Sequence, residues 1–214
     1  LHTAYSFDAF LNGNRSADPD TAYRWAKGLP VIHPYHRARV RVNDPLDFLV
    51  VADHAEFLGV IRKLYYDVHD GPGAKFAQQV RDAFDSGQGG AMFAEILPMG
   101  VVAPGDTKDP ISDEGAPNSL PVAAFGEELR RDAWAEPTAA ADRHNEPGQF
   151  TAMIGWEWSS LPSGANLHRV VMTPVDGEIA RTFMPFGSDE SSYPDDLWAW
   201  LDKTTKETGA EFVA

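Results

Sequence analysis

The sequence predicts an α/β fold with a mainly parallel sheet, either open or closed into a barrel. Short apolar runs alternate along the chain with segments of helical periodicity, which is the pattern of this fold class. The clearest run covers residues 47–53, where five consecutive apolar residues from Phe48 to Ala52 end in Asp53. A continuous apolar run is typical of a strand that is buried on both faces, as the strands of parallel sheets are.

Further strands are expected at residues 150–157 and 168–173, and another strand is expected to begin at Glu211. Residues 1–10 resemble the end of a strand followed by a loop. The segment 29–46 combines prolines with a basic patch formed by Arg37, Arg39 and Arg41. Because proline interrupts regular structure, we expect a loop there with at most one edge strand.

Helical periodicity and capping residues predict helices at about 18–27, 54–66, 74–86, 121–143 and 195–207. Asp18 or Asp20 would cap the first of them. The fourth is expected to be interrupted near Pro137, because proline lacks a backbone N–H. The segment 104–119 is expected to be a long irregular loop, a feature that is usually functional or mobile inside a compact domain, and we take it as a candidate for substrate specificity.

Composition narrows the classes of function. The 214 residues include 32 acidic and 18 basic side chains, and the net charge of -14 argues against nucleic acid or an anionic membrane surface as the main partner. Cysteine is absent, so a metal ion would have to be bound by His, Asp or Glu. No apolar run approaches the roughly 18 residues that a membrane span needs. The chain opens at Leu1 without Met, so we expect a processed or partial chain.

Histidine and acidic residues recur where the expected strands end. They are His2 with Asp8, Asp53 and His54 followed by Glu56, then Glu157, and finally His168. In α/β folds the carboxyl ends of the strands carry the chemistry, so these side chains are expected to meet in one cavity. Imidazole and carboxylate together suit Zn²⁺, Mn²⁺ or Fe²⁺, whereas Mg²⁺ and Ca²⁺ prefer oxygen ligands. The pattern therefore predicts a metal site.

These residues also have plainer interpretations. His168 could be a hydrogen-bonded structural histidine, and Glu157 could be a surface residue on a two-sided strand. Trp156 and Trp158 flank Glu157 and could instead form a platform on which a sugar stacks.

The order of the motifs resembles the PHP superfamily, the polymerase and histidinol phosphatase group of metal-dependent hydrolases. The motifs are His2-Thr3-x-x-Ser6-x-Asp8, a strand ending in Asp53-His54, Gly155-x-Glu157, and His168 at a strand start. The longer segments 53–59 and 154–158 resemble one large bacterial PHP-like branch that is catalogued as a domain of unknown function. The resemblance covers both ends and the middle of the chain.

The resemblance implies a distorted (β/α)₇ barrel with up to three metal ions at the carboxyl ends of its strands. His2, Asp8, His54 and His168 would be metal ligands, and Glu157 would bridge two metals. Asp53 would be a ligand, or an acid that orients His54 and helps to take a proton.

The family pattern also extends past this chain, because its first histidine would precede Leu1 and its last ligands would follow Ala214. We therefore expect residues 1–214 to form one partial domain. Within it, residues 66–150 would be a long insertion that builds a cap next to the substrate.

The expected function is metal-dependent hydrolysis of a small anionic phosphate ester, with Asp53 and Glu157 as catalytic residues. Arg37, Arg39 or Arg169 would contact the anion. Two alternatives stay open, namely hydrolysis of a sulfate ester at the same site and a non-catalytic binding module with the same fold. The sequence leaves the compartment, periplasmic or cytoplasmic, and the oligomeric state undecided.

Overall fold

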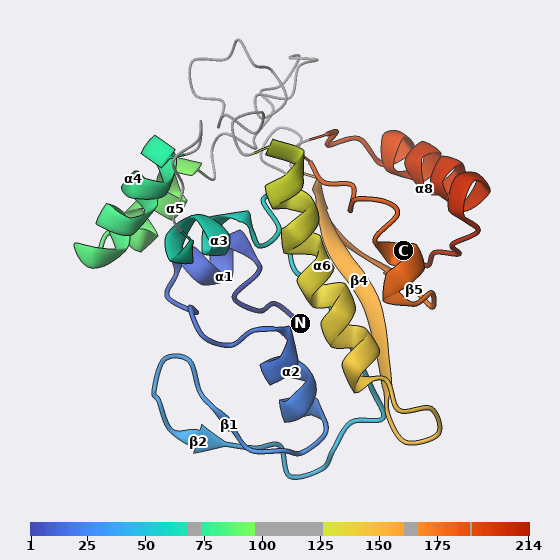
Figure 1. Ribbon diagram of the computed structural model, residues 1–214, viewed down its shortest axis with the longest axis horizontal. Coiled ribbons are helices and arrows are strands. Elements are labelled where there is room, and N and C mark those ends of the chain that lie inside the picture. Colours follow the sequence, from blue (N-terminus) through green and yellow to red (C-terminus); the bar gives the residue numbers. More distant parts are fainter. Residues whose placement is uncertain (68–73, 97–125, 161–166, 189) are drawn as a thin grey trace.

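The computed structural model describes residues 1–67, 74–96, 126–160, 167–188 and 190–214. Within these residues the chain forms a mixed α/β structure with a three-stranded sheet and a small two-stranded sheet. The larger sheet has the order β3-β4-β5, with β3 at Phe48–Val51, β4 at Thr151–Ser160 and β5 at Leu167–Thr173. The smaller sheet is a hairpin of β1 (Val31–Ile32) and β2 (Arg39–Val40), which lies below α2 in the view of Figure 1.

Eight helices are present in the described part of the chain. They are α1 (Phe7–Leu11), α2 (Pro19–Ala26), α3 (Val60–Tyr66), α4 (Ala74–Asp85), α5 (Gly89–Ile96), α6 (Gly126–His144), α7 (Gly177–Ala180) and α8 (Pro194–Thr208). Helix α6 packs against β4, and α2 packs against β3 and α6 (Figure 1). Helix α6 belongs to residues 66–150 and contacts β4. The description of this range as an inserted cap stays a prediction.

The mixed α/β class is confirmed, and β3 and β4 pair parallel, as expected for the strands of a mainly parallel sheet. The expectation of a mainly parallel sheet is wrong for β4 and β5, which pair antiparallel over seven residue positions from Ile154–Thr173 to Ser160–Leu167. Only residues 161–166 separate these two strands, and a connection of that length joins antiparallel neighbours, whereas a parallel crossover needs a dozen residues or more. The described strands do not close into a barrel.

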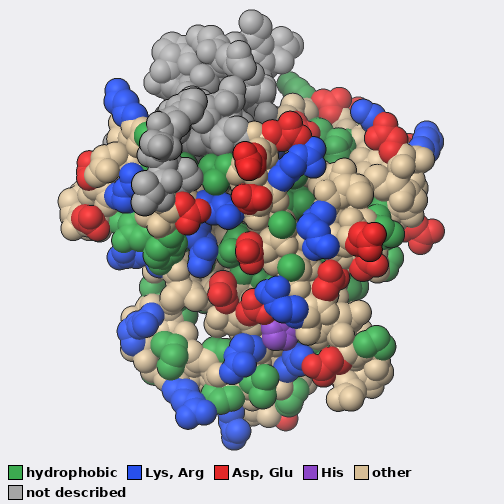
Figure 2. All heavy atoms as spheres, viewed as in Figure 1, with side chains coloured by type: hydrophobic (Ala, Val, Ile, Leu, Met, Phe, Trp, Pro, Cys, Tyr) green, Lys and Arg blue, Asp and Glu red, His purple; other side chains and the backbone are tan. Residues whose placement is uncertain are grey.

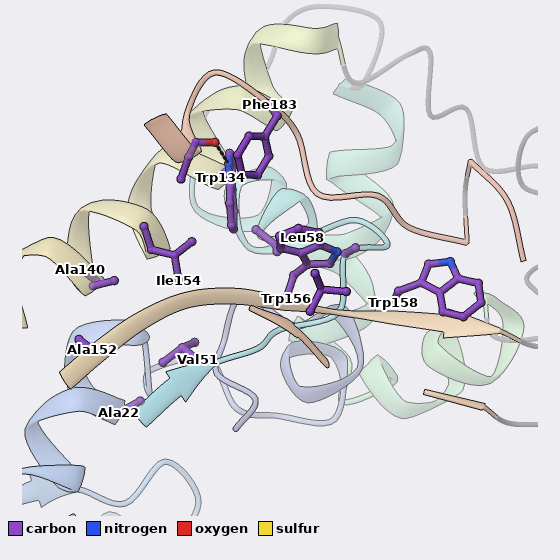
Figure 3. Close-up of a cluster of buried hydrophobic side chains, with 14 of the residues drawn as sticks. Ala22, Val51, Leu58, Trp134, Ala140, Ala152, Ile154, Trp156, Trp158 and Phe183 are labelled. Carbon is purple, nitrogen blue, oxygen red and sulfur yellow. Dashed lines mark hydrogen bonds between the residues drawn. The ribbon is translucent and has the colours of Figure 1, made fainter. Parts of the chain in front are cut away.

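The main core lies between one face of the sheet and the helices α2 and α6 (Figure 3). The side chains of Trp134, Trp156 and Phe183 pack together there, and Trp156 is fully buried. Each buried indole has a partner for its N–H, since Trp134 Nε1 donates to Ala180 O at 2.9 Å and Trp156 Nε1 donates to Phe186 O at 3.1 Å. A second apolar cluster joins α1, α3 and α4 through Phe10, Ile61 and Val80, among others.

Several expected helices are confirmed. Helix α2 begins after Asp18, whose carboxylate accepts the N–H of Thr21, and α8 ends at Gly209, which has a positive φ of 76°. Helix α4 and the strands β4 and β5 also lie within a few residues of their predicted bounds.

Other expectations are wrong. Helix α6 continues through Pro137, and the hydroxyl of Thr138 donates to Trp134 O and Ala135 O in the same turn. Residues 7–11 form a helix where we expected a strand end and a loop, and residues 89–96 form a helix where no element was predicted. The strand expected at Glu211 is reduced to one bridge between Val213 and Met172.

Helix α3 begins at Val60, later than its expected start at His54. Residues 55–59 form a turn in which Phe57 and Gly59 have positive φ. This turn is what buries Glu56 beside His54. The expected loop 104–119 lies outside the described residues.

Candidate functional site

The register of the parallel strand pair brings His54 next to Glu157. Val51 pairs with Ile154, and the ladder continues past the end of β3 to an isolated bridge between His54 and Glu157. Two backbone hydrogen bonds hold this extension, from Glu157 N to Asp53 O and from Ala55 N to Glu157 O. Because paired residues in a parallel ladder point to the same face, both side chains leave the sheet on the face opposite Trp156.

The antiparallel pair adds His168 to the same face. His168 pairs with Ser159, which is two residues beyond Glu157 on β4, so His168 is a diagonal neighbour of Glu157. Gly155 has no side chain, and this lets the neighbouring strands pack closely beside it. A Cβ at this position would lie 2.6 Å from Val50 Cγ1 and 2.7 Å from Val171 O. Any larger residue at position 155 would force the strands apart.

The N-terminal segment supplies His2 and Asp8. Ala52 N donates to Leu1 O at 3.0 Å, which holds the first residue beside the end of β3. His2 then extends over the sheet face and contacts Glu157 through Nε2. Asp8 is in the first turn of α1, where acidic residues are favourable because of the helix dipole.

The five predicted metal ligands therefore meet in one place. His2, Asp8 and His54 each offer a ligand atom within 4.8 Å of one another, and His54, Glu157 and His168 form a second such group. The two carboxylate oxygens of Glu157 face different histidines, with Oε2 on His2 Nε2 and Oε1 at 2.6 Å from His168 Nδ1. His54 belongs to both groups, and its ring centroid lies 4.6 Å from that of His2 and 5.2 Å from that of His168.

Residues that the site prediction did not include hold His54 in place. Its Nδ1 lies 3.0 Å from Ser159 Oγ and 3.5 Å from Glu56 Oε2. Glu56 is buried, and its Oε1 accepts the backbone N–H of Ser159 and of Ser188. The sequence signal was the Asp-His-x-Glu run itself, in which Glu56 is the fourth member.

Asp53 has a different environment from the one we expected. Its carboxylate accepts hydrogen bonds from the backbone N–H of Thr3 and from Thr3 Oγ1, the latter at 2.6 Å. These bonds fasten the N-terminal segment that carries His2. In the structure the groups that orient His54 are Glu56 and Ser159.

Burial and hydrogen bonding shift several pKa values in opposite directions. Burial raises the pKa of Asp53 to about 6, although the bonds from Thr3 oppose the shift. Burial would also raise the pKa of Asp8 and Glu56, but hydrogen bonds and neighbouring histidines outweigh it, so the pKa of each is lowered. Burial lowers the pKa of His2, yet Asp8 and Glu157 outweigh burial and raise it. Asp8 and Glu56 therefore carry negative charge beside the imidazoles, an environment that suits a cation.

The predicted arginines lie elsewhere. Arg37 and Arg39 are in the β1–β2 hairpin, where Arg37 Nη1 donates to Ser16 Oγ at 3.2 Å. Arg169 pairs in register with Trp158, so strand alternation directs it to the face opposite His168. Their contact with a substrate anion stays a prediction.

The interpretation of Trp156 and Trp158 as a sugar platform is wrong. Both indoles are buried, and Trp158 Nε1 donates to Ser191 O at 2.9 Å. A side chain that is enclosed in the core has no face left for a ligand to stack on.

The described residues thus define a mixed α/β protein with a histidine and carboxylate cluster at the carboxyl end of a parallel strand pair. The family model described as "Protein of unknown function (DUF3604)" matches residues 1–214, and the chain belongs to this family. No curated protein and no solved structure matches the chain. None of the described helices combines the length and the apolar character needed to cross a membrane.

Proposed function

We propose that this protein is a metal-dependent hydrolase of phosphate esters, related to the PHP superfamily, with His2, Asp8, His54, Glu157 and His168 as its metal ligands. The observation that carries the proposal is the position of Glu157, whose two carboxylate oxygens face two different histidines. A carboxylate in this position is suited to join two metal ions.

The chemistry of the donor set fits divalent transition metals. The cluster combines the imidazole nitrogens of three histidines with the carboxylate oxygens of Asp8 and Glu157, and the ligand atoms of each group of three lie within 4.8 Å of one another. Zn²⁺, Mn²⁺ and Fe²⁺ accept this mixture, whereas Mg²⁺ and Ca²⁺ favour oxygen alone. When bound, such ions supply Lewis acidity toward the ester and activate a water for attack.

The protein's own groups orient the ligands. Ser159 and Glu56 fix the ring of His54 through Nδ1, which leaves Nε2 directed toward Asp8 at 3.8 Å. Ser6 Oγ lies 3.2 Å from His2 Nδ1 and so limits the rotation of that ring. Groups of this kind usually raise metal affinity because they hold the ligating atoms ready. Asp53 acts as a positioning residue, since its bonds to Thr3 hold the segment between His2 and Asp8.

The test uses the purified chain, its metal content and two chromogenic esters. Elemental mass spectrometry should find bound transition metal, and nitrophenyl phosphate should be hydrolysed when Mn²⁺ or Zn²⁺ is added. Glu157→Ala and His54→Ala should each lower turnover by roughly a hundredfold or more. His36→Ala is the matched control, because His36 is an exposed histidine of the hairpin region, and it should leave turnover unchanged.

Three outcomes would change the assignment. Unchanged turnover in Glu157→Ala and His54→Ala would remove it. Faster hydrolysis of nitrophenyl sulfate than of nitrophenyl phosphate would favour the sulfate-ester alternative. Metal binding without turnover of either ester would favour a non-catalytic binding module.

A further inference from the structure

A second concave site lies between helix α2 and the β1–β2 hairpin and shares no residue with the histidine cluster. It is a pocket of about 300 Å³. Three arginines line it, Arg24 from α2 and Arg37 and Arg39 from the hairpin, together with the hydroxyl residues Ser16 and Thr21. Residues 30–32 contribute an apolar part of the wall.

The hairpin is fastened over α2 by its turn. Arg37 has a φ of 56°, a left-handed conformation that is uncommon for a residue other than glycine. Its backbone N–H donates to His33 O at 3.0 Å, and its guanidinium donates to Ser16 Oγ at 3.2 Å. Tyr35, at the tip of the turn, lies against Gly13. These contacts fix the position of one arginine at the rim of the pocket.

In the part of the chain that the structure describes, no carboxylate lies within salt-bridge distance of Arg24, Arg37 or Arg39. The nearby acids are engaged, because Asp18 Oδ1 accepts from both the N–H and the hydroxyl of Thr21, and Asp20 pairs with Arg143 and His144. Three arginines without an ion-pair partner among the described residues thus meet at one pocket, in a chain whose net charge is -14.

Basic side chains also gather on the molecular surface around the hairpin (Figure 2). Figure 2 shows Lys and Arg side chains gathered on the lower part of the molecule, where Figure 1 places the hairpin, and the surface is hollowed beside them. Arg24, Arg37 and Arg39 are all exposed, so a ligand can reach them from solvent. Guanidinium groups bind tetrahedral oxyanions through paired N–H donors, and hydroxyl groups add further donors.

We propose that this pocket binds the phosphate or sulfate group of a small molecule through Arg24, Arg37, Arg39, Ser16 and Thr21. The bound oxyanion would neutralise the cluster of positive charge and hold the hairpin against α2. The inference does not depend on the proposed hydrolase function, because the two sites have no side chain in common.

Calorimetric titration of the whole chain with inorganic phosphate, and separately with inorganic sulfate, tests the proposal. Chelator is present throughout, so that the histidine cluster holds no metal, and sodium chloride keeps the ionic strength constant. Arg24→Gln and Arg39→Gln should each raise the Kd for phosphate roughly tenfold or more, because each removes a charged donor. Arg39→Lys should also weaken binding, since lysine keeps the charge but loses the paired donors.

The matched control is Arg41→Gln, which removes the same charge from an exposed position two residues beyond Arg39 and outside the pocket. It should leave the Kd nearly unchanged, and so should His54→Ala. Circular dichroism confirms that each variant is folded. Absence of binding by both anions, an equal effect of Arg41→Gln, or loss of binding in His54→Ala would overturn the proposal. Binding of phosphate alone would restrict the ligand to phosphate compounds, and equal binding of both anions would support general oxyanion recognition.

Discussion

The two faces of strand β4 have different roles, one in the core and one in the candidate site. On one face Trp156 and Trp158 are enclosed by helices and make the core, and each indole N–H is bonded to a backbone carbonyl. On the other face Glu157, only one position away from each of them, lies among histidines at the site. Strand alternation thus lets neighbouring residues serve stability and chemistry separately, so substitutions on the two faces should have separable effects.

The largest expected effect is on the core face. Trp156→Ala should lower the free energy of unfolding by about 3–5 kcal/mol, because it removes a fully buried indole and leaves a cavity. Urea unfolding in the presence of chelator measures this without a contribution from bound metal. Glu157→Gln, one residue along on the site face, should change the same quantity by less than about 1 kcal/mol. Equal losses in the two variants would mean that the faces are not separable.

An intermediate effect is expected at Glu56, the buried acid beside His54. Glu56→Gln should cost about 1–3 kcal/mol of stability, because the buried N–H groups of Ser159 and Ser188 lose a charged acceptor. If the proposed metal site is correct, metal affinity should also fall by roughly 10- to 100-fold, since His54 loses its orienting partner.

The control for Glu56 is Glu146→Gln, which removes a half-exposed acid that pairs with Lys27. It should change stability by less than about 1 kcal/mol and leave metal affinity unaltered. Metal titration followed by calorimetry gives the affinities. An unchanged affinity in Glu56→Gln would show that Glu56 serves the fold alone.

The smallest effect is expected at the periphery, where Asp20 of α2 pairs with Arg143 and His144 of α6. Burial would raise the pKa of Asp20, but its hydrogen bonds with Arg143 and His144 outweigh burial and lower it. Because the folded-state pKa lies below the unfolded value, this ion pair stabilises the fold above the unfolded pKa. That contribution is lost as the pH falls through the folded pKa.

Asp20→Asn should therefore lower stability by no more than about 1 kcal/mol near neutral pH, as is usual for exposed ion pairs. The difference from the unmodified protein should stay constant down to about pH 4, the ordinary pKa of an aspartate, and should shrink as the pH is lowered further. Thermal unfolding at several pH values measures it. A difference that grows on acidification would contradict the assigned direction of the pKa shift.

Local signals in the sequence were sufficient for several elements. Asp18 before Pro19 and Gly209 after α8 mark helix ends, and these signals act within one turn. Pro137 misled the prediction because a proline weakens a helix locally, whereas the buried Trp134 and Ala140 hold both halves of α6 against the same core. Helix α5 was not predicted because it begins with two glycines, which have low helix propensity.

The candidate site, like the fold, was predicted only in part. The recurrence of His, Asp and Glu at the ends of expected strands is visible along the sequence, and it included His2, His54 and Glu157. The antiparallel direction of β5 and the role of Glu56 are not visible there, because both depend on contacts between distant segments. The turn at 55–59, with Phe57 in a left-handed conformation, is what directs Glu56 toward His54.

The sequence by itself determined, through local signals, which residue types alternate along each strand, the start of α2 and the end of α8, and the fact that any metal would have to meet imidazole and carboxylate. The tertiary structure alone decided the register that sets His54 beside Glu157 and the placement of Arg37 and Arg39 away from that cluster. The difference lies in the sequence separation over which each interaction acts. Capping and alternation act between residues a few positions apart, whereas the register of two strands is set by burial of whole faces against helices that lie far away in the chain.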